Sequence, residues 1–99
     1  MSKVKIYEGE SQTMVVVHCP GCGLGHPFRT RGDGPKWTWN GDMEAPTFSP
    51  SMLVNKDYPK SRCHSFVENG KIRFLGDCHH DLKNTTVDLP DLNADGDPA

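Results

Sequence analysis

Apolar and polar residues alternate along the chain in short runs, and no segment has the spacing of an amphipathic helix. In no window of eleven residues do apolar positions recur clearly at i, i+3 and i+4. Ten glycines and eight prolines interrupt the pattern every few residues. We therefore expect an all-β protein, built as a small antiparallel β-sheet or a partly open barrel of short strands.

Eight short segments have the composition of strands, because they are rich in β-branched or aromatic residues and are bounded by turn residues. The segment 45–51 contains Pro46 and Pro50, which exclude a helix and favour an extended backbone. Trp37 and Trp39 alternate with threonine, so both indoles should point to one face. The predicted strands are residues 4–7, 13–18, 26–31, 37–40, 51–54, 63–68, 71–75 and 85–89.

Asn69-Gly70 between two of these segments predicts a β-hairpin with a type I′ turn. In such a hairpin the numbers of paired residues add to 139. Cys63 and Cys78 are then diagonal neighbours at its open end, about 7–8 Å apart. His64 lies on the opposite face of the same strand. A bulge at Gly76 is compatible with the sequence and would shift this register.

The chain is short of core-forming residues for its length. Leu, Ile, Val and Phe make up 19 of the 99 residues, close to the limit at which a packed core becomes too thin. Disorder normally also requires a high net charge, and this chain carries only −2. A folded domain with so small a core commonly depends on a metal ion or on disulfides.

All four cysteines fall in three clusters, which begin at Cys19, Cys63 and Cys78. Cys19-Pro20-Gly21-Cys22 has the Cys-x-x-Cys spacing that lets two thiolates meet at one ion. The favoured ligand set for a structural Zn²⁺ is therefore Cys19, Cys22, Cys63 and Cys78. A histidine in place of one cysteine is the alternative, taken from His26, His64 and His80. If no metal is bound, the four cysteines could instead form two disulfides or remain free thiols.

The number of protein ligands decides what such a metal could do. Four protein ligands close the coordination shell, whereas three ligands and a water could activate that water for hydrolysis. If the protein is an enzyme, its candidate catalytic residues are Asp77, His80 and His64, which follow or accompany the cysteines. The alternative function from the residues alone is therefore a zinc-dependent hydrolase with an open metal position near Asp77 and His80.

One segment of the chain interleaves aromatic and basic side chains. Trp37 and Trp39 stand near Arg29, Arg31 and Lys36. Such a mixture suits a protein partner, and it is also how single-stranded nucleic acids are bound by stacking and charge. Because the net charge is −2, a nucleic acid is the less favoured partner. These five residues are the candidate partner-binding set.

Residues 1–90 are expected to form a single zinc-stabilised β domain, followed by an acidic, frayed tail at 91–99. Residues 1–18 lack the apolar stretch of a signal peptide, and no apolar run is long enough to span a membrane. We therefore expect a cytoplasmic protein, whose thiols stay reduced and available to metal. An exposed strand edge would allow a dimer, but the sequence does not decide the oligomeric state.

Six ordered motifs span about residues 14–92 of the chain. They are Cys19-Pro20-Gly21-Cys22 with His26, Trp37-Thr38-Trp39-Asn40-Gly41-Asp42, Pro46-Thr47-Phe48-Ser49-Pro50-Ser51, Arg62-Cys63-His64-Ser65-Phe66, Phe74-Leu75-Gly76-Asp77-Cys78 with His80, and Thr86-Val87-Asp88-Leu89-Pro90. Together these motifs resemble a family of small uncharacterised proteins encoded by tailed phages and prophages. Genome labels often call this family "ammonia monooxygenase", a membrane copper enzyme that a chain without a membrane span does not fit.

The resemblance implies a phage accessory protein that works in the bacterial cytoplasm, with zinc. Asn40, Asp42, His64, Asp77 and His80 match the polar positions of the family motifs. The chain departs from the family at residues 79–83, which makes His79 the less functional histidine of its pair. On this basis the favoured function is a zinc-stabilised module that binds a host or phage protein, for example to inhibit a host defence, and more a binding protein than an enzyme. A nucleic-acid-binding module is the third hypothesis.

Overall fold

The computed structural model describes residues 2–99, which form nine short strands and no helix. The prediction of an all-β protein is therefore confirmed. Each of the eight predicted strands overlaps an observed one. The strands are β1 Lys5–Glu8, β2 Thr13–Cys19, β3 Leu24–Arg31, β4 Thr38–Trp39, β5 Phe48–Ser49, β6 Met52–Val54, β7 Cys63–Glu68, β8 Lys71–Phe74 and β9 Thr86–Asp88.

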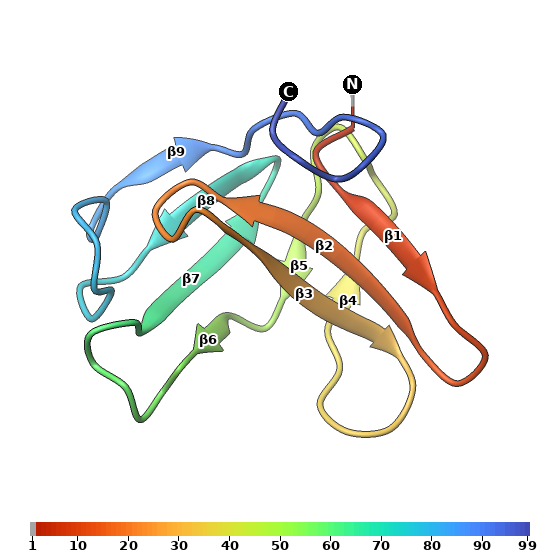
Figure 1. The fold of residues 1–99 in the computed structure, drawn as a ribbon, viewed down its shortest axis with the longest axis horizontal. Helices are drawn as coiled ribbons and strands as arrows, with labels where there is room; N and C mark the ends of the chain where they lie inside the picture. Colours follow the sequence, from red (N-terminus) through yellow and green to blue (C-terminus); the bar gives the residue numbers. More distant parts are fainter. Residues whose placement is uncertain (1) are drawn as a thin grey trace.

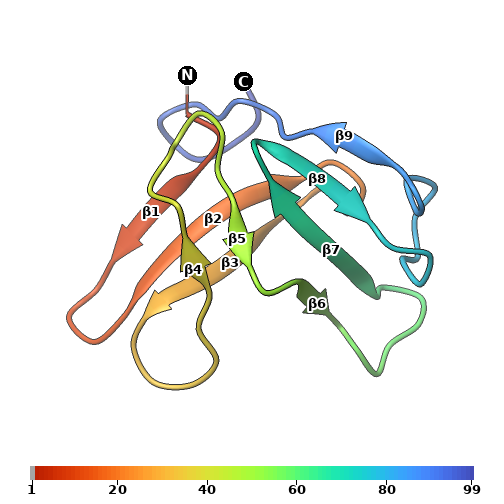
Figure 2. The ribbon, with the colours of Figure 1, turned by 180° about the vertical axis from the view of Figure 1, so that it is seen from behind.

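The strands form three antiparallel sheets that do not close into a barrel (Figure 1). β1, β2 and β3 make one sheet in sequence order, and β6, β7, β8 and β9 make a second. A two-stranded ribbon of β4 and β5 connects them, and β5 leads directly into β6 (Figure 2). β5 was not predicted, because it contains only two residues and lies between Pro46 and Pro50.

The core lies where the inner faces of these sheets meet. β2 alternates buried and partly buried residues, as expected for a strand with one face on the core. Aromatic side chains from β3, β5 and the residue just before β4 fill one end of the core. The rings of Phe28 and Phe48 stack with centroids 4.1 Å apart, and Trp37 meets Phe28 edge-on at 5.5 Å. At the other end the core contains Cys19, Cys63 and Cys78.

The β7–β8 hairpin has the predicted register. Glu68 pairs with Lys71 and Ser65 with Phe74, so the paired numbers add to 139. Asn69 and Gly70 both have positive φ, 51° and 78°, as a type I′ turn requires. This hairpin supplies the strand that carries the functional residues described below.

The end of the chain folds back beside its start. Leu92 is 5% exposed and donates its main-chain N–H to the Ser2 carbonyl at 2.7 Å. The Lys5 ammonium donates to the Ala94 carbonyl at 2.8 Å, and Lys3 lies 3.5 Å from the Asp91 carboxylate. Residues of the segment 91–99 thus contact the first residues of the chain. Within residues 2–99 there is no helix with the length and apolar character needed to cross a bilayer.

Candidate active site and metal centre

Two groups of chemically active side chains lie on the two faces of β7. Successive side chains of a strand point in opposite directions. Cys63 therefore faces the core, where it is 1% exposed, while the side chain of His64 faces outward and is 25% exposed. The inner group surrounds Cys63 and the outer group surrounds His64.

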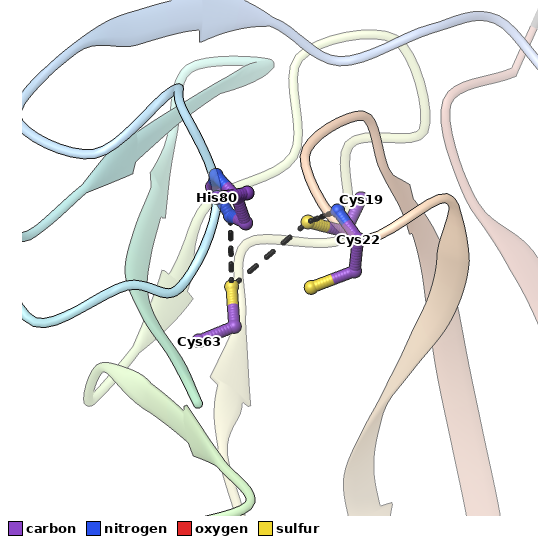
Figure 3. Close-up of side chains that lie close together, drawn as sticks. All are labelled: Cys19, Cys22, Cys63 and His80. Carbon is purple, nitrogen blue, oxygen red and sulfur yellow. Dashed lines mark hydrogen bonds between the residues drawn. The ribbon is translucent and has the colours of Figure 1, made fainter. Parts of the chain in front are cut away.

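The inner group is a four-donor cluster made of Cys19, Cys22, Cys63 and His80 (Figure 3). Their donor atoms all lie within 4.8 Å of one another. Cys63 Sγ is 4.0 Å from Cys19 Sγ and 3.6 Å from His80 Nε2. Three thiols and an imidazole at this spacing are compatible with a metal ion such as zinc, which prefers four sulfur and nitrogen ligands in a tetrahedral arrangement.

The turn after β2 is shaped to present its two cysteines. The main-chain N–H of Cys22 points at Cys19 Sγ at 3.3 Å, and Gly23 closes the turn by donating to the Cys19 carbonyl at 2.9 Å. Gly21 has no side chain where the His80 ring passes, and a Cβ there would lie 2.3 Å from the ring. The glycine between the cysteines therefore makes room for the fourth donor.

His80 is held in place by its own loop. The main-chain N–H of Leu82 donates to Nδ1 at 3.2 Å, and the ring of Phe74 packs edge-on against the imidazole at 4.5 Å. These contacts orient the ring so that Nε2 faces Cys63. Support of this kind around a metal-binding histidine is usual, because it fixes the direction of the donor atom.

The thiols of the cluster influence one another strongly. The bond from the Cys63 thiol lowers the pKa of Cys19 to about 3, and the same bond holds the pKa of Cys63 well above its usual range. Burial, together with the negative charge on Cys19, raises the pKa of Cys22 to about 11. One thiolate forms readily, and three together would need a cation to offset their charge.

The outer group is a row of three side chains, Ser51, His64 and Asp77, in which the Ser51 hydroxyl hydrogen-bonds to one imidazole nitrogen and the Asp77 carboxylate lies close to the other. Ser51 Oγ lies 3.1 Å from His64 Nε2. On the other side of the ring, His64 Nδ1 lies 3.4 Å from Asp77 Oδ2. A hydroxyl, an imidazole and a carboxylate in this order can remove the proton from the hydroxyl oxygen and make it a nucleophile.

Strand register brings Ser51 to His64. β6 pairs with β7 so that Leu53 is opposite His64 and Met52 is opposite Ser65. Continuing the same register places Ser51 opposite Phe66, diagonal to His64 and on the same outer face. Diagonal neighbours on a sheet are close enough for their side chains to meet.

A two-residue insertion brings Asp77 to the other side of His64. The Leu75 N–H still donates to the His64 carbonyl, in the register of the hairpin, but the His79 N–H donates to the Arg62 carbonyl. The residue numbers of a hydrogen-bonded pair thus add to 139 at Leu75 and His64, but to 141 at His79 and Arg62. The extra residues form a turn at Gly76 and Asp77 that places the carboxylate beside the imidazole. The sequence predicted that the register could slip at Gly76, but not the size of the shift.

The same shift decides where Cys78 and His80 lie. Without it Cys78 would be the diagonal neighbour of Cys63. Instead, Cys78 Sγ contacts the main chain of His64, 3.2 Å from both the nitrogen and the carbonyl oxygen. The structure therefore brings His80, and not Cys78, into the four-donor cluster.

The other histidine named as an alternative ligand also lies outside the four-donor group. His26 is 3% exposed, and its Nε2 has no hydrogen-bond partner within residues 2–99. It lies beside the cluster, where its ring helps to lower the pKa of Cys19. His64, the remaining alternative, faces the opposite side of the strand.

The five candidate partner-binding residues all make contacts within the chain. Arg29 bonds to Gln12 Oε1, Arg31 to the Gly9 carbonyl and Lys36 to the Gly32 carbonyl, so these cations stabilise loops. Both indoles are half-buried against the phenylalanine rings of the core. Trp37 has a second contact, because its Nε1–H donates to the Ser51 carbonyl at 3.2 Å.

Asn40 and Asp42, which match polar positions of the resemblance, stabilise the turn after β4. Asn40 Oδ1 accepts the main-chain N–H of Asp42 and of Thr47. Asp42 Oδ1 accepts the N–H of Glu44 and of Ala45, and these bonds lower the pKa of its carboxyl. Both residues therefore stabilise this turn, and they contact neither the outer nor the inner group.

Sequence reasoning missed Ser51. It was quoted within a family motif, but the serines and threonines near the histidines were too numerous for one to be selected. The signal that could have identified it was the start of the strand predicted at residues 51–54, next to the strand that carries His64. Only the pairing of β6 with β7 distinguishes Ser51 from the other serines.

Comparison with known protein families gives a match. A family model with the description "Bacterial ubiquitination-like system serine protease (BubE)" covers residues 1–75. The matched part contains Cys19, Cys22, Cys63, Ser51 and His64 and ends just before Gly76. No curated protein and no solved structure matches the chain significantly.

Proposed function

The chain belongs to the BubE family of bacterial ubiquitination-like systems, and from this premise we propose that it is a serine peptidase. In this proposal Ser51 is the nucleophile, His64 is the general base and Asp77 is the residue that positions the imidazole. The substrate is a protein, so the protein partner expected from the sequence becomes the substrate itself. A phage origin, implied by the resemblance, is not needed for this function.

One observation carries the proposal. Both nitrogens of His64 are engaged at once, Nε2 by Ser51 Oγ at 3.1 Å and Nδ1 by Asp77 Oδ2 at 3.4 Å. A histidine that served only to stabilise the sheet would not need a hydroxyl on one nitrogen and a carboxylate on the other. The three residues come from three separate segments, the residue just before β6, the strand β7 and the turn after β8.

The geometry defines the order of proton transfers. The Asp77 carboxylate accepts the Nδ1–H of His64, which leaves the Nε2 lone pair free to accept the Ser51 proton as the oxygen attacks the peptide carbonyl. The imidazolium, stabilised by Asp77, then gives that proton to the departing amine. An acyl ester on Ser51 remains. Water hydrolyses this ester, with His64 first taking a proton from the water and then giving it to the departing Ser51 oxygen.

The metal, in this proposal zinc, has a structural role. Cys19, Cys22, Cys63 and His80 would hold it, and four protein ligands leave no position for a reacting water. When bound, it would supply folding free energy and a rigid link between segments. The zinc hydrolase, which was the alternative hypothesis from the sequence, used Asp77, His80 and His64 at an open metal position. Here His64 and Asp77 work with Ser51 instead, and His80 belongs to the metal cluster.

A fluorophosphonate probe, which forms a covalent bond with activated serines, tests the function. We expect the purified metal-loaded protein to gain one probe at Ser51, identified by peptide mass spectrometry. Ser51→Ala should abolish labelling, and His64→Ala should slow it by about 10³-fold or more, because the base is lost. Ser49→Ala is the matched control and should label normally, since Ser49 is a neighbouring exposed serine with no histidine contact. Labelling that persists in Ser51→Ala would exclude Ser51 as the nucleophile.

A further inference from the structure

The strand that begins beside Ser51 has an open edge. β6 is the outermost strand of its sheet, with β7 on one side and no strand on the other (Figure 2). An edge strand offers main-chain groups to which another extended chain can pair. Whether β6 does so depends on which of its residues direct these groups outward.

The hydrogen bonds of His64 show that Leu53 faces the open edge. The His64 carbonyl accepts the Leu75 N–H at 2.9 Å, and the His64 N–H points to Cys78 Sγ, so both groups point away from β6. In an antiparallel pair, opposite residues either exchange both bonds or direct both away from each other. The Leu53 N–H and carbonyl therefore point outward. Among residues 2–99 no other strand lies on that side to bond them.

The same edge is closed on the other side of Ser51. β4 pairs with β5, with Thr38 opposite Ser49, and the Trp37 indole donates to the Ser51 carbonyl. The protein itself thus occupies the edge up to the nucleophile, and the edge becomes open at Leu53. Leu53 is two residues from Ser51, which is about 7 Å along a strand.

Two apolar side chains, Leu53 and Phe66, lie on the outer face next to this edge. Leu53 is 40% exposed and lies opposite His64. Phe66 is opposite Ser51 in the same register, and the Arg73 guanidinium lies 4.4 Å from its ring centroid. An extended chain beside Leu53 would therefore meet apolar side chains on the face that carries the nucleophile.

We propose that an extended peptide segment of the substrate adds to the sheet along β6. One substrate residue exchanges two main-chain hydrogen bonds with Leu53, and the scissile carbonyl lies about two residues further along, at Ser51 Oγ. Strand addition of this kind takes its affinity from main-chain bonds and its specificity from side-chain pockets. The proposal rests on the proposed function, because it orients the substrate for Ser51.

The first test compares peptidyl phosphonates of two lengths, which react with an activated serine as peptide substrates do. Each of the two probe sets carries a mixture of all residue types at the position next to phosphorus. One set has that single residue, and the other set has four residues. We expect the four-residue mixture to label the wild-type protein at least tenfold faster. Leu53→Pro removes the outward N–H of an edge strand without removing a main-chain bond to β7, and it should remove most of this advantage. Leu53→Val keeps the N–H and should retain it.

The second test uses the wild-type protein, so its outcome does not depend on the folding of a variant. Each nitrogen of the four-residue phosphonates is methylated in turn, which removes one donor at a time. Strand addition at Leu53 predicts that one position loses about tenfold in rate while its neighbours lose much less. Equal sensitivity at every position, or at none, would overturn the proposal.

The remaining outcomes are also decisive. A length advantage that survives in Leu53→Pro would overturn strand addition while leaving the serine peptidase intact. If Leu53→Pro instead converts a dimer to a monomer in sedimentation and leaves the phosphonate rates unchanged, the edge is an interface between two copies. If the small fluorophosphonate does not label Ser51 in the wild-type protein, the proposed function itself fails, independently of the edge.

Discussion

Gly21 controls how closely the turn after β2 approaches His80. A methyl group at this position would meet the imidazole ring at 2.3 Å, so the ring would have to move. We expect Gly21→Ala to displace His80, to lower the bound zinc clearly below one ion per chain and to cost about 3 kcal/mol of stability. Zinc analysis and thermal unfolding measure both effects. Pro20→Ala, an exposed change in the same turn, should keep a full zinc content, and an equal loss there would contradict this explanation.

Cys19 and Cys78 are both buried cysteines, but only the first belongs to the four-donor cluster. We expect Cys19→Ser to lose the metal and much of the folded structure, because metal binding contributes to folding. Cys78→Ser should keep one zinc ion, since a serine hydroxyl can make the same contacts with the His64 main chain. Elemental analysis of the two variants distinguishes the ligand sets. Loss of zinc in Cys78→Ser would restore the set of four cysteines.

The β7–β8 hairpin depends on its turn as much as on its strands. Gly70 has φ 78°, and a Cβ there would lie 3.2 Å from Ala45 Cα and from the Glu44 carbonyl. Gly70→Ala should therefore cost about 2 kcal/mol, through both the left-handed backbone and the close contact. Denaturant unfolding measures this loss. Asn69→Gly keeps a residue suited to positive φ and should change the stability by less than about 0.5 kcal/mol.

This hairpin also marks how far the sequence could predict the structure. Asn69-Gly70 determines the turn, the turn determines the register, and the register places Cys63 and His64 on opposite faces. Local signals of this kind can be read from the chain. The two-residue shift at Gly76 and Asp77 depends instead on long-range contacts, which no local pattern reveals. The fourth donor and the partner of His64 were therefore ambiguous before the structure was known.

For the molecule as a whole, the four-donor cluster is the link between two sheets. Cys19 and Cys22 come from the end of β2 and the turn after it, whereas Cys63 begins β7 and His80 lies in the loop between β8 and β9 (Figure 3). We expect a chelator to lower the unfolding midpoint by at least about 20 °C, because the small core alone provides little stability. Acid should release the ion as well, since protons compete with it for the thiolates. An unfolding midpoint unchanged by chelator would show that the metal does not stabilise the fold.

The alternation along β7 has a consequence for evolution. Under the proposed function one residue of the strand serves the metal and the next serves the nucleophile, so a slip of one position would exchange their faces. The spacing from Cys63 through His80 is therefore constrained by two functions at once. Homologous sequences should gain or lose residues in the exposed stretch 55–61, which touches neither group, and keep a constant length between Cys63 and His80.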